Sequence, residues 1–222
     1  MKKGNLILEI PLIKQPKDSK DCGIVGIQML LKYYGIEKSF QNLKKEIEVD
    51  NTGTYAPQLG NYLIKNGFTV EIVTLHPALF TKNDENLSQN QILDRFNKLY
   101  KNHKSRQNKK VLKHFIDFMH ANGKIKVKIP NKEDITEEIK EKRPVCALMT
   151  SNFLKGKKPS FNFHFNLITG IDDEFIYAND SLPDERGGQN KYLIPDFFYG
   201  LYCSAYGDVD NACLIKVRNN YK

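Results

Sequence analysis

The sequence predicts an α+β fold in which an N-terminal helix packs on a C-terminal antiparallel sheet. Helical patterns dominate the first half of the 222 residues, and strand patterns follow one another from Val145 onward. Strands that follow each other without intervening helices pair with antiparallel neighbours. The apolar fraction of 40%, with 13 Phe and 11 Tyr, is enough to bury a core and excludes disorder as the main state. We expect residues 1–222 to form a single domain.

The N-terminal segment predicts a short strand, a polar loop and an apolar helix. Residues 6–10 are apolar, whereas residues 14–21 are polar and contain a proline. From Cys22 the sequence CGIVGIQMLLKYYGI is apolar on nearly every side, which is typical of a central buried helix. Asp21 is suited to cap its start, and Gly35 is suited to end it.

The middle of the chain alternates between short helices and strands, with one segment of different character. Residues 76–123 combine a polar linker with two basic helical patterns, and we interpret them as a helical insertion. In chain order we expect helices at 39–49 and 56–66, a strand at 68–75, helices at 89–103 and 109–121, a strand at 124–129 and a helix at 135–141.

The last third of the chain reads as strands. Apolar or alternating runs cover 145–150, 163–171, 175–179 and 212–217, with a Gly187-Gly188 turn and a short helix at 195–199 between the last two. These runs supply the antiparallel sheet.

The net charge of +8 is concentrated in the insertion. Between Lys98 and Lys128 ten basic residues face one acid, Asp117. Such an excess attracts anionic partners, but only five of the 34 basic residues are Arg, which phosphate recognition prefers. Two interpretations stay open, a solvated basic face and a surface that binds an anionic partner.

The sequence offers no sign of a membrane segment or a metal site. No run approaches the roughly 18 apolar residues of a membrane span, and Glu9 and Pro11 interrupt any signal-peptide pattern, so we expect a cytoplasmic protein. The four cysteines show neither CxxC pairs nor zinc spacing, and we expect reduced thiols, no metal and no cofactor. Of these, Cys146 and Cys213 lie in predicted strands and should be buried and inert.

Cys22 is the residue best placed for nucleophilic chemistry. It begins the apolar helix directly after a polar loop, where unpaired backbone N–H groups and the helix dipole favour a thiolate. A buried structural cysteine is the alternative, because most free cysteines are buried and Gly23 and Gly26 also suit close packing.

A thiolate nucleophile needs a base, and His164 is the candidate. It stands at the start of the apolar strand FHFNLITGI, although a core histidine with satisfied hydrogen bonds would fit the same pattern. We expect the other four histidines to lie at the surface: His76, His103, His114 and His120.

Asp180 is the candidate that would orient this base. It ends the strand after His164, and a hairpin of 163–171 with 175–179 brings the end of the second strand beside the start of the first. His164 and Asp180 should therefore be neighbours, unless Asp180 is an ordinary turn residue. Acyl transfer also needs oxyanion donors, for which the loop residue Gln15 and the N–H of Cys22 are candidates.

Taken together, these segments resemble the papain-like peptidases related to the double-glycine leader peptidases of bacteriocin exporters. The N-terminal part of the resemblance is Gln15-x6-Cys22-Gly23, where Cys22 begins the helix that ends Lys32-Tyr33-Tyr34-Gly35. The C-terminal part has its motifs in the same order as the family: Arg143-Pro144-Val145, the strand that begins near His164 and contains Thr169-Gly170, then Asn179-Asp180, and last Ile194-Pro195-Asp196-Phe197-Phe198. It implies a papain-like fold, with Cys22 as nucleophile, His164 as base and acid, Asp180 as its orienting partner and Gln15 as oxyanion donor. Three departures stand out: Gln15 is one residue further from Cys22 than is usual, Ser181 replaces a common Pro, and Phe163 stands where a small residue commonly precedes the His.

The resemblance implies a cysteine hydrolase that cleaves a peptide or isopeptide bond in a peptide or protein substrate through an acyl-enzyme. Two alternatives remain at this stage. The first is an acyltransferase of the phytochelatin-synthase type, which passes the acyl group to an amine or thiol. The second is a non-catalytic binder in which the basic insertion holds an anionic partner.

Overall fold

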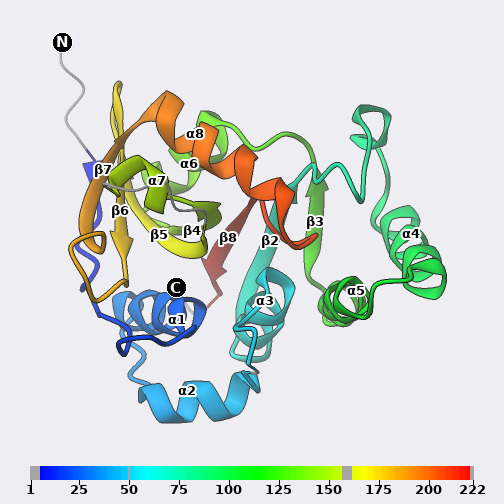
Figure 1. Cartoon of the computed structure of the whole chain (residues 1–222), viewed down its shortest axis with the longest axis horizontal. Helices are drawn as coiled ribbons and strands as arrows, with labels where there is room; N and C mark the ends of the chain where they lie inside the picture. Colours follow the sequence, from blue (N-terminus) through cyan, green and yellow to red (C-terminus); the bar gives the residue numbers. More distant parts are fainter. Residues whose placement is uncertain (1–5, 50, 157–161, 221–222) are drawn as a thin grey trace.

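The computed structural model describes residues 6–49, 51–156 and 162–220, and the described strands form one eight-stranded sheet (Figure 1). The helices are α1 (Cys22–Tyr33), α2 (Phe40–Ile47), α3 (Ala56–Lys65), α4 (Gln89–Asn102), α5 (Arg106–His120), α6 (Lys132–Lys140), α7 (Asn152–Lys155) and α8 (Ile194–Cys203). The strands are β1 (Leu6–Ile7), β2 (Phe68–Thr74), β3 (Lys124–Val127), β4 (Val145–Thr150), β5 (Phe163–Ile171), β6 (Phe175–Asp180), β7 (Gly188–Leu193) and β8 (Cys213–Asn219).

The sheet has the order β3-β2-β8-β4-β5-β6-β7, and β1 pairs with the far end of β5. Every pair is antiparallel except β2 with β3. The prediction of an α+β fold with an antiparallel sheet is confirmed. Strand β4 and all but the first residue of β5 are buried on both faces, which requires helices on both sides of the sheet.

Figure 1 shows that arrangement, with α1 and α3 on one side of the sheet and α6 and α8 on the other. Helix α1 packs on β5, and eight of its twelve residues are buried, as its apolar sequence predicts. Gly35 follows the helix with a φ of 79°, a left-handed conformation that glycine adopts without strain. The sequence therefore fixes the C-terminal end of α1 as expected.

The predicted role of Asp21 as a side-chain cap is wrong. Its backbone occupies the cap position with φ −95° and ψ 18°, and its side chain makes no capping hydrogen bond. The buried carboxylate instead pairs with Lys44 Nζ at 3.0 Å. The ion pair ties the start of α1 to α2.

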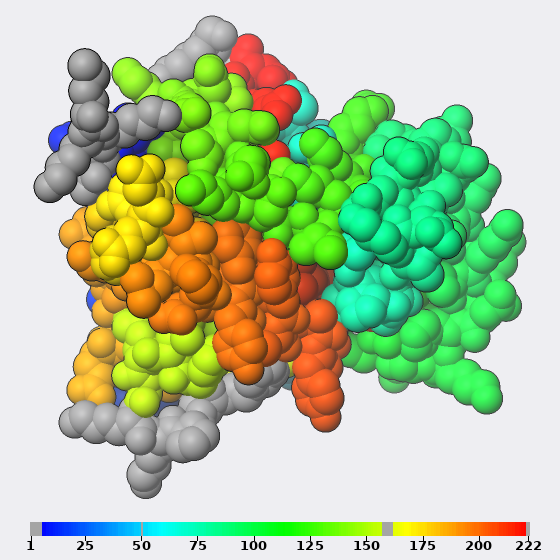
Figure 2. Space-filling view, turned by 90° about the horizontal axis from the view of Figure 1, so that it is seen from above, coloured from blue at the N-terminus to red at the C-terminus, as the bar shows by residue number. Residues whose placement is uncertain are grey.

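Helices α4 and α5 form a lobe at one end of the molecule (Figure 2). They pack against each other through Phe96 and Phe115, whose ring centroids lie 4.9 Å apart, and α5 also contacts α3 and β3. The two helices that the periodicity predicts in residues 76–123 are thus present. The structure attaches them to the body through an apolar interface.

The histidine predictions fail at His76, which is buried while its Nδ1 accepts a hydrogen bond from the N–H of Ala78. His103 and His114 are half-buried, and His120 is exposed. A loop position before a proline gives no sequence signal of burial, because burial depends on what packs over the loop.

Strand β7 was not predicted from the sequence, which indicated only a glycine turn and a short helix in this region. The segment GQNKYL is largely polar because β7 is an edge strand, with one face partly exposed. Helix α8 is correspondingly longer than expected. None of the helices in the described ranges is long and apolar enough to cross a membrane.

Candidate active site

Cys22 is the first residue of α1 and is half-buried. Its sulfur accepts hydrogen bonds from the backbone N–H groups of Gly23 and Phe165. The next position has no room for a side chain, because a Cβ on Gly23 would lie 2.1 Å from Thr54 Oγ1. The glycine after the nucleophile candidate therefore allows the loop that carries Thr54 to approach the helix start.

His164 and Asp180 come together through the register of the β5–β6 hairpin. The ladder pairs Asn166 with Asp180, so His164, two residues earlier on the same face of β5, lies beside the end of β6. The His164 Nε2 and the Asp180 Oδ1 are 2.8 Å apart, and both side chains are buried. The same Oδ1 accepts the N–H of Leu182 at 2.9 Å, which holds the carboxylate in place.

The imidazole of His164 also forms a hydrogen bond with the thiol of Cys22. Because Asp180 engages Nε2, Nδ1 is the ring nitrogen left for the sulfur. His164 thus lies between a thiol and a carboxylate, each of which engages a different ring nitrogen.

The electrostatics of the pair favour separated charges. Burial raises the pKa of the Cys22 thiol, but the charge and hydrogen bond of His164 and the two N–H groups outweigh it, so the pKa falls below its ordinary 9.0. Burial lowers the pKa of His164, yet Cys22 and Asp180 raise it from 6.5 to about 10. Both shifts favour the thiolate–imidazolium form over the neutral pair.

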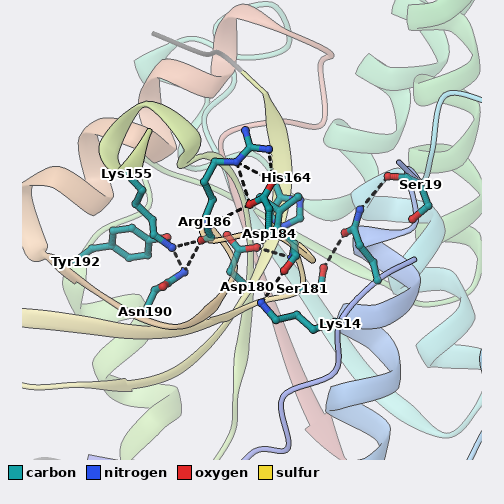
Figure 3. A network of polar contacts seen from close by, with 12 residues as sticks. Lys14, Ser19, Lys155, His164, Asp180, Ser181, Asp184, Arg186, Asn190 and Tyr192 are labelled. Atoms are coloured by element: carbon teal, nitrogen blue, oxygen red, sulfur yellow. Dashed lines mark hydrogen bonds and ion pairs between the residues drawn. The ribbon is translucent and has the colours of Figure 1, made fainter. Parts of the chain in front are cut away.

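Gln15 lies in the same cleft as Cys22 and is buried. Its Oε1 accepts a hydrogen bond from the hydroxyl of Ser181 at 2.9 Å, and its Nε2 donates to the carbonyl of Ser19 at 2.9 Å (Figure 3). The amide has a second N–H on Nε2 for the cleft. The structure therefore brings all four sequence-predicted site residues together.

Sequence reasoning missed the cations near Asp180. Lys155 and Arg186 both interact with its charge, and the ammonium of Lys155 donates to the backbone carbonyl of Arg186 (Figure 3). They come from the short helix α7 and from the loop before β7, two segments that the sequence patterns did not predict.

The other cysteines differ sharply from Cys22. Cys146 and Cys213 are buried, and burial raises the pKa of Cys146 to about 12 and that of Cys213 well above its usual range. The prediction that both thiols are buried is confirmed, and their low reactivity stays a prediction. Among the described residues, no cluster of three His, Cys, Asp or Glu side chains is arranged to hold a metal ion.

Solved structures share this fold. The chain is similar to a putative C39-like peptidase from Bacillus anthracis, with 15% identity and a TM-score of 0.56, over 99% of this chain and 100% of that one. It is also similar to the peptidase domain of Streptococcus ComA, a bifunctional ABC transporter involved in a quorum-sensing pathway, and to a double-glycine-motif protease from an AMS/PCAT transporter in complex with the leader peptide. Each is 15% identical, with TM-scores of 0.49 and 0.47, over 96% of this chain and 100% and 94% of those chains.

The papain-like α+β fold that the sequence motifs predict is confirmed. Residues 7–209 match the Peptidase_C39 like family, and the chain belongs to this family. A comparison with curated protein sequences finds no significant match.

Proposed function

We propose that the protein is a cysteine peptidase that hydrolyses a peptide or isopeptide bond through Cys22, His164 and Asp180. One observation carries the proposal: the imidazole of His164 lies between the thiol of Cys22 and the carboxylate of Asp180, at the start of a helix. Membership of a peptidase family supports the same reaction class.

The geometry suggests the following steps. The thiolate of Cys22 attacks the carbonyl carbon, the C=O π electrons move to oxygen, and a tetrahedral oxyanion forms. The imidazolium of His164 donates its proton to the leaving nitrogen as the C–N bond breaks, which leaves a thioester on Cys22. His164 then takes a proton from water, the hydroxide attacks the thioester, and the thiolate leaves with the acid product released.

Gln15 would act on the oxyanion together with the N–H of Cys22. The amide lines the cleft beside the sulfur, and Ser181 and Ser19 hold its orientation. A donor held in place before the reaction stabilises developing charge without reorganisation.

We further propose that residues 1–222 work as one peptidase domain with 76–123 as an insertion. Gln107 of α5 donates to the hydroxyl of Tyr55 at 2.7 Å and to Asp208 at 3.3 Å, and both partners line the cleft of Cys22. The insertion therefore contacts the rim of the site.

Selective alkylation tests the proposed nucleophile. Treatment with substoichiometric iodoacetamide followed by peptide mapping should modify Cys22 far ahead of Cys146 and Cys213, and also ahead of the half-buried Cys203. Similar modification of Cys22 and Cys203 would argue against an activated thiol. If peptides are turned over, product analysis with an added amine or thiol distinguishes hydrolysis from acyl transfer.

A groove on the insertion favours a second, accessory role in binding anionic segments. It is lined by Tyr100, Arg106, Gln107, Lys109, Lys110, Lys113 and His114, and it shares Gln107 with the contact to the cleft rim. We propose that an acidic part of the substrate binds there by charge complementarity. Replacing Lys109 with Glu should then raise KM for an acidic substrate and weaken its salt dependence, whereas Lys140→Glu, on α6, serves as a control.

A further inference from the structure

The floor of the active-site cleft contains buried polar atoms that the proposed catalytic steps do not use. The cleft has a volume of about 380 Å³. Among the described residues, five polar side-chain atoms that line it have no hydrogen-bond partner: Ser19 Oγ, Thr54 Oγ1, Asn152 Oδ1, Asp210 Oδ1 and Asn211 Nδ2. Folded proteins pair the large majority of such atoms, because leaving one unpaired costs about 1–3 kcal/mol. Five of the thirteen such atoms in the described residues belong to side chains that line this one cleft, which points to a ligand.

Asp210 is the only acidic member of this set, and its environment is unusual. The side chain is 2% exposed, and Oδ2 accepts the N–H of Ala56 in the first turn of α3 at 2.7 Å. No ion pair to Asp210 occurs within the described parts of the chain. Its Oδ1 is buried without a hydrogen-bond partner, and the residue lines the cleft. Burial raises the pKa of Asp210 to about 7, and the nearby Asp208 contributes to the rise.

The polar floor lies close to the candidate nucleophile. Thr54 occupies the space beside Gly23, the residue after Cys22, and Ala56, two residues further, is bonded to Asp210. Asn152, which is 2% exposed, follows the end of β4, and β4 pairs with β5, the strand that carries His164 near its start. A side chain that fills this floor would therefore belong to a substrate residue near the scissile bond.

The chemistry of the floor selects a positively charged hydrogen-bond donor. Two carboxylates, Asp208 and Asp210, line the cleft, and they would repel an acidic side chain. Lys20 also lines it, but its ammonium donates to the carbonyl of Asn51 at 2.8 Å. Glycine or an aliphatic side chain would leave every one of these polar atoms unpaired. An ammonium or guanidinium would supply a positive partner for the carboxylate of Asp210.

We propose that Asp210, with Asn152 and Thr54, forms a substrate subsite for a basic side chain close to the scissile bond. This inference rests on the proposed peptidase function, since it names the substrate class of the same cleft. The subsite would take Lys or Arg and discriminate against uncharged side chains of the same length.

Peptidyl chloromethyl ketones test the subsite without requiring turnover. In this reaction the sulfur of Cys22 displaces chloride and forms a C–S bond, and the rate reports how well the peptide is seated. Three pairs of tripeptide reagents carry lysine or norleucine at the first, second or third residue from the ketone. At one position the lysine reagent should label the parent protein at least about tenfold faster, which corresponds to about 1.4 kcal/mol.

Asp210→Asn is the informative variant, because asparagine retains an acceptor for the N–H of Ala56 and nearly the same shape. It should reduce the lysine-to-norleucine ratio to about one, because the lysine reagent loses its counter-charge and reacts more slowly. Asp173→Asn is the control, since that carboxylate is exposed in the turn after β5 and is not among the residues that line the cleft, and it should keep the ratio. Thermal unfolding of each variant verifies the fold, and Thr54→Val provides a second change at the floor that should also lower the ratio.

The outcomes separate the subsite from the peptidase proposal. Equal rates for lysine and norleucine at all three positions, or a ratio that survives Asp210→Asn, would overturn the subsite even if peptides are cleaved. A lysine preference that depends on Asp210, without cleavage of any peptide, would support the subsite and overturn the peptidase. Failure of every reagent to modify Cys22 would overturn both.

Discussion

Ser181 donates its hydroxyl hydrogen to Gln15 Oε1 at 2.9 Å, and the backbone N–H of Gln15 donates to the carbonyl of Ser181 at 2.8 Å. Ser181 directly follows Asp180, so the end of β6 positions both the carboxylate that forms a hydrogen bond with His164 and the candidate oxyanion donor. Ser181, which stands where the family often has a proline, thus has Gln15 as its hydrogen-bond partner.

Gln15→Ala should lower kcat by a factor on the order of 10² and leave KM nearly unchanged, because an oxyanion donor acts mainly in the transition state. Steady-state kinetics on any cleaved peptide measure this split. Equal kcat values for Gln15→Ala and the parent, with a large loss in Ser19→Ala, would transfer the donor role to the unpaired hydroxyl of Ser19.

Ser181→Ala should lower kcat by roughly tenfold, because loss of the hydroxyl leaves the buried Oε1 of Gln15 unpaired and frees the amide to rotate. The effect should vanish in a Gln15→Ala background if Ser181 acts only through Gln15. A double-mutant cycle on kcat provides that comparison. Additive losses would show that Ser181 acts by another route.

The rate of Cys22 alkylation should rise with pH at values below 9.0, because the thiolate is the reactive form and His164 lowers the pKa of the thiol. Turnover should in addition fall as the pH passes the raised pKa of His164, since the neutral imidazole cannot protonate the leaving nitrogen. His164→Ala should move the rise in alkylation to higher pH. An unchanged alkylation profile in that variant would contradict the ion pair.

Asp180→Asn should retain partial activity, because the amide preserves the shape of the side chain while it stabilises the imidazolium less. We expect kcat to fall by ~10- to ~10³-fold, less than in His164→Ala. Asp184→Asn is a suitable control, since Asp184 is exposed and pairs with Arg186 outside the triad. A loss in Asp184→Asn as large as that in Asp180→Asn would contradict a specific role for Asp180.

Local patterns predicted that His164 and Asp180 are neighbours. The alternation of β5 and β6 and the short turn between them determine the hairpin, and the hairpin alone places His164 beside Asp180. The apolar run after Cys22 predicts α1, and its burial on β5 brings the helix start to the same strand. These relationships depend on register and periodicity, which a sequence displays directly.

Contacts between loops could not be predicted in this way. Gln15 and Ser181 are 166 residues apart, and their hydrogen bond depends on how the N-terminal loop crosses the end of β6. The segment DVDNA, residues 208–212, has the composition of an exposed loop, so the sequence does not predict that Asp210 is buried. Its burial arises only when the 51–55 loop and the first turn of α3 pack against it. The polar floor is therefore a property of the packed loops.

The most direct test of the central claim is peptide cleavage by a Cys22→Ala variant. The parent protein is incubated with a mixed peptide library, products are identified by mass spectrometry, and the variant is compared with Cys203→Ala, which removes another half-buried thiol. With both variants shown to be folded, Cys22→Ala should lose at least about 10³-fold in rate and Cys203→Ala should match the parent. A folded Cys22→Ala protein that cleaves the library as fast as the parent would contradict the account.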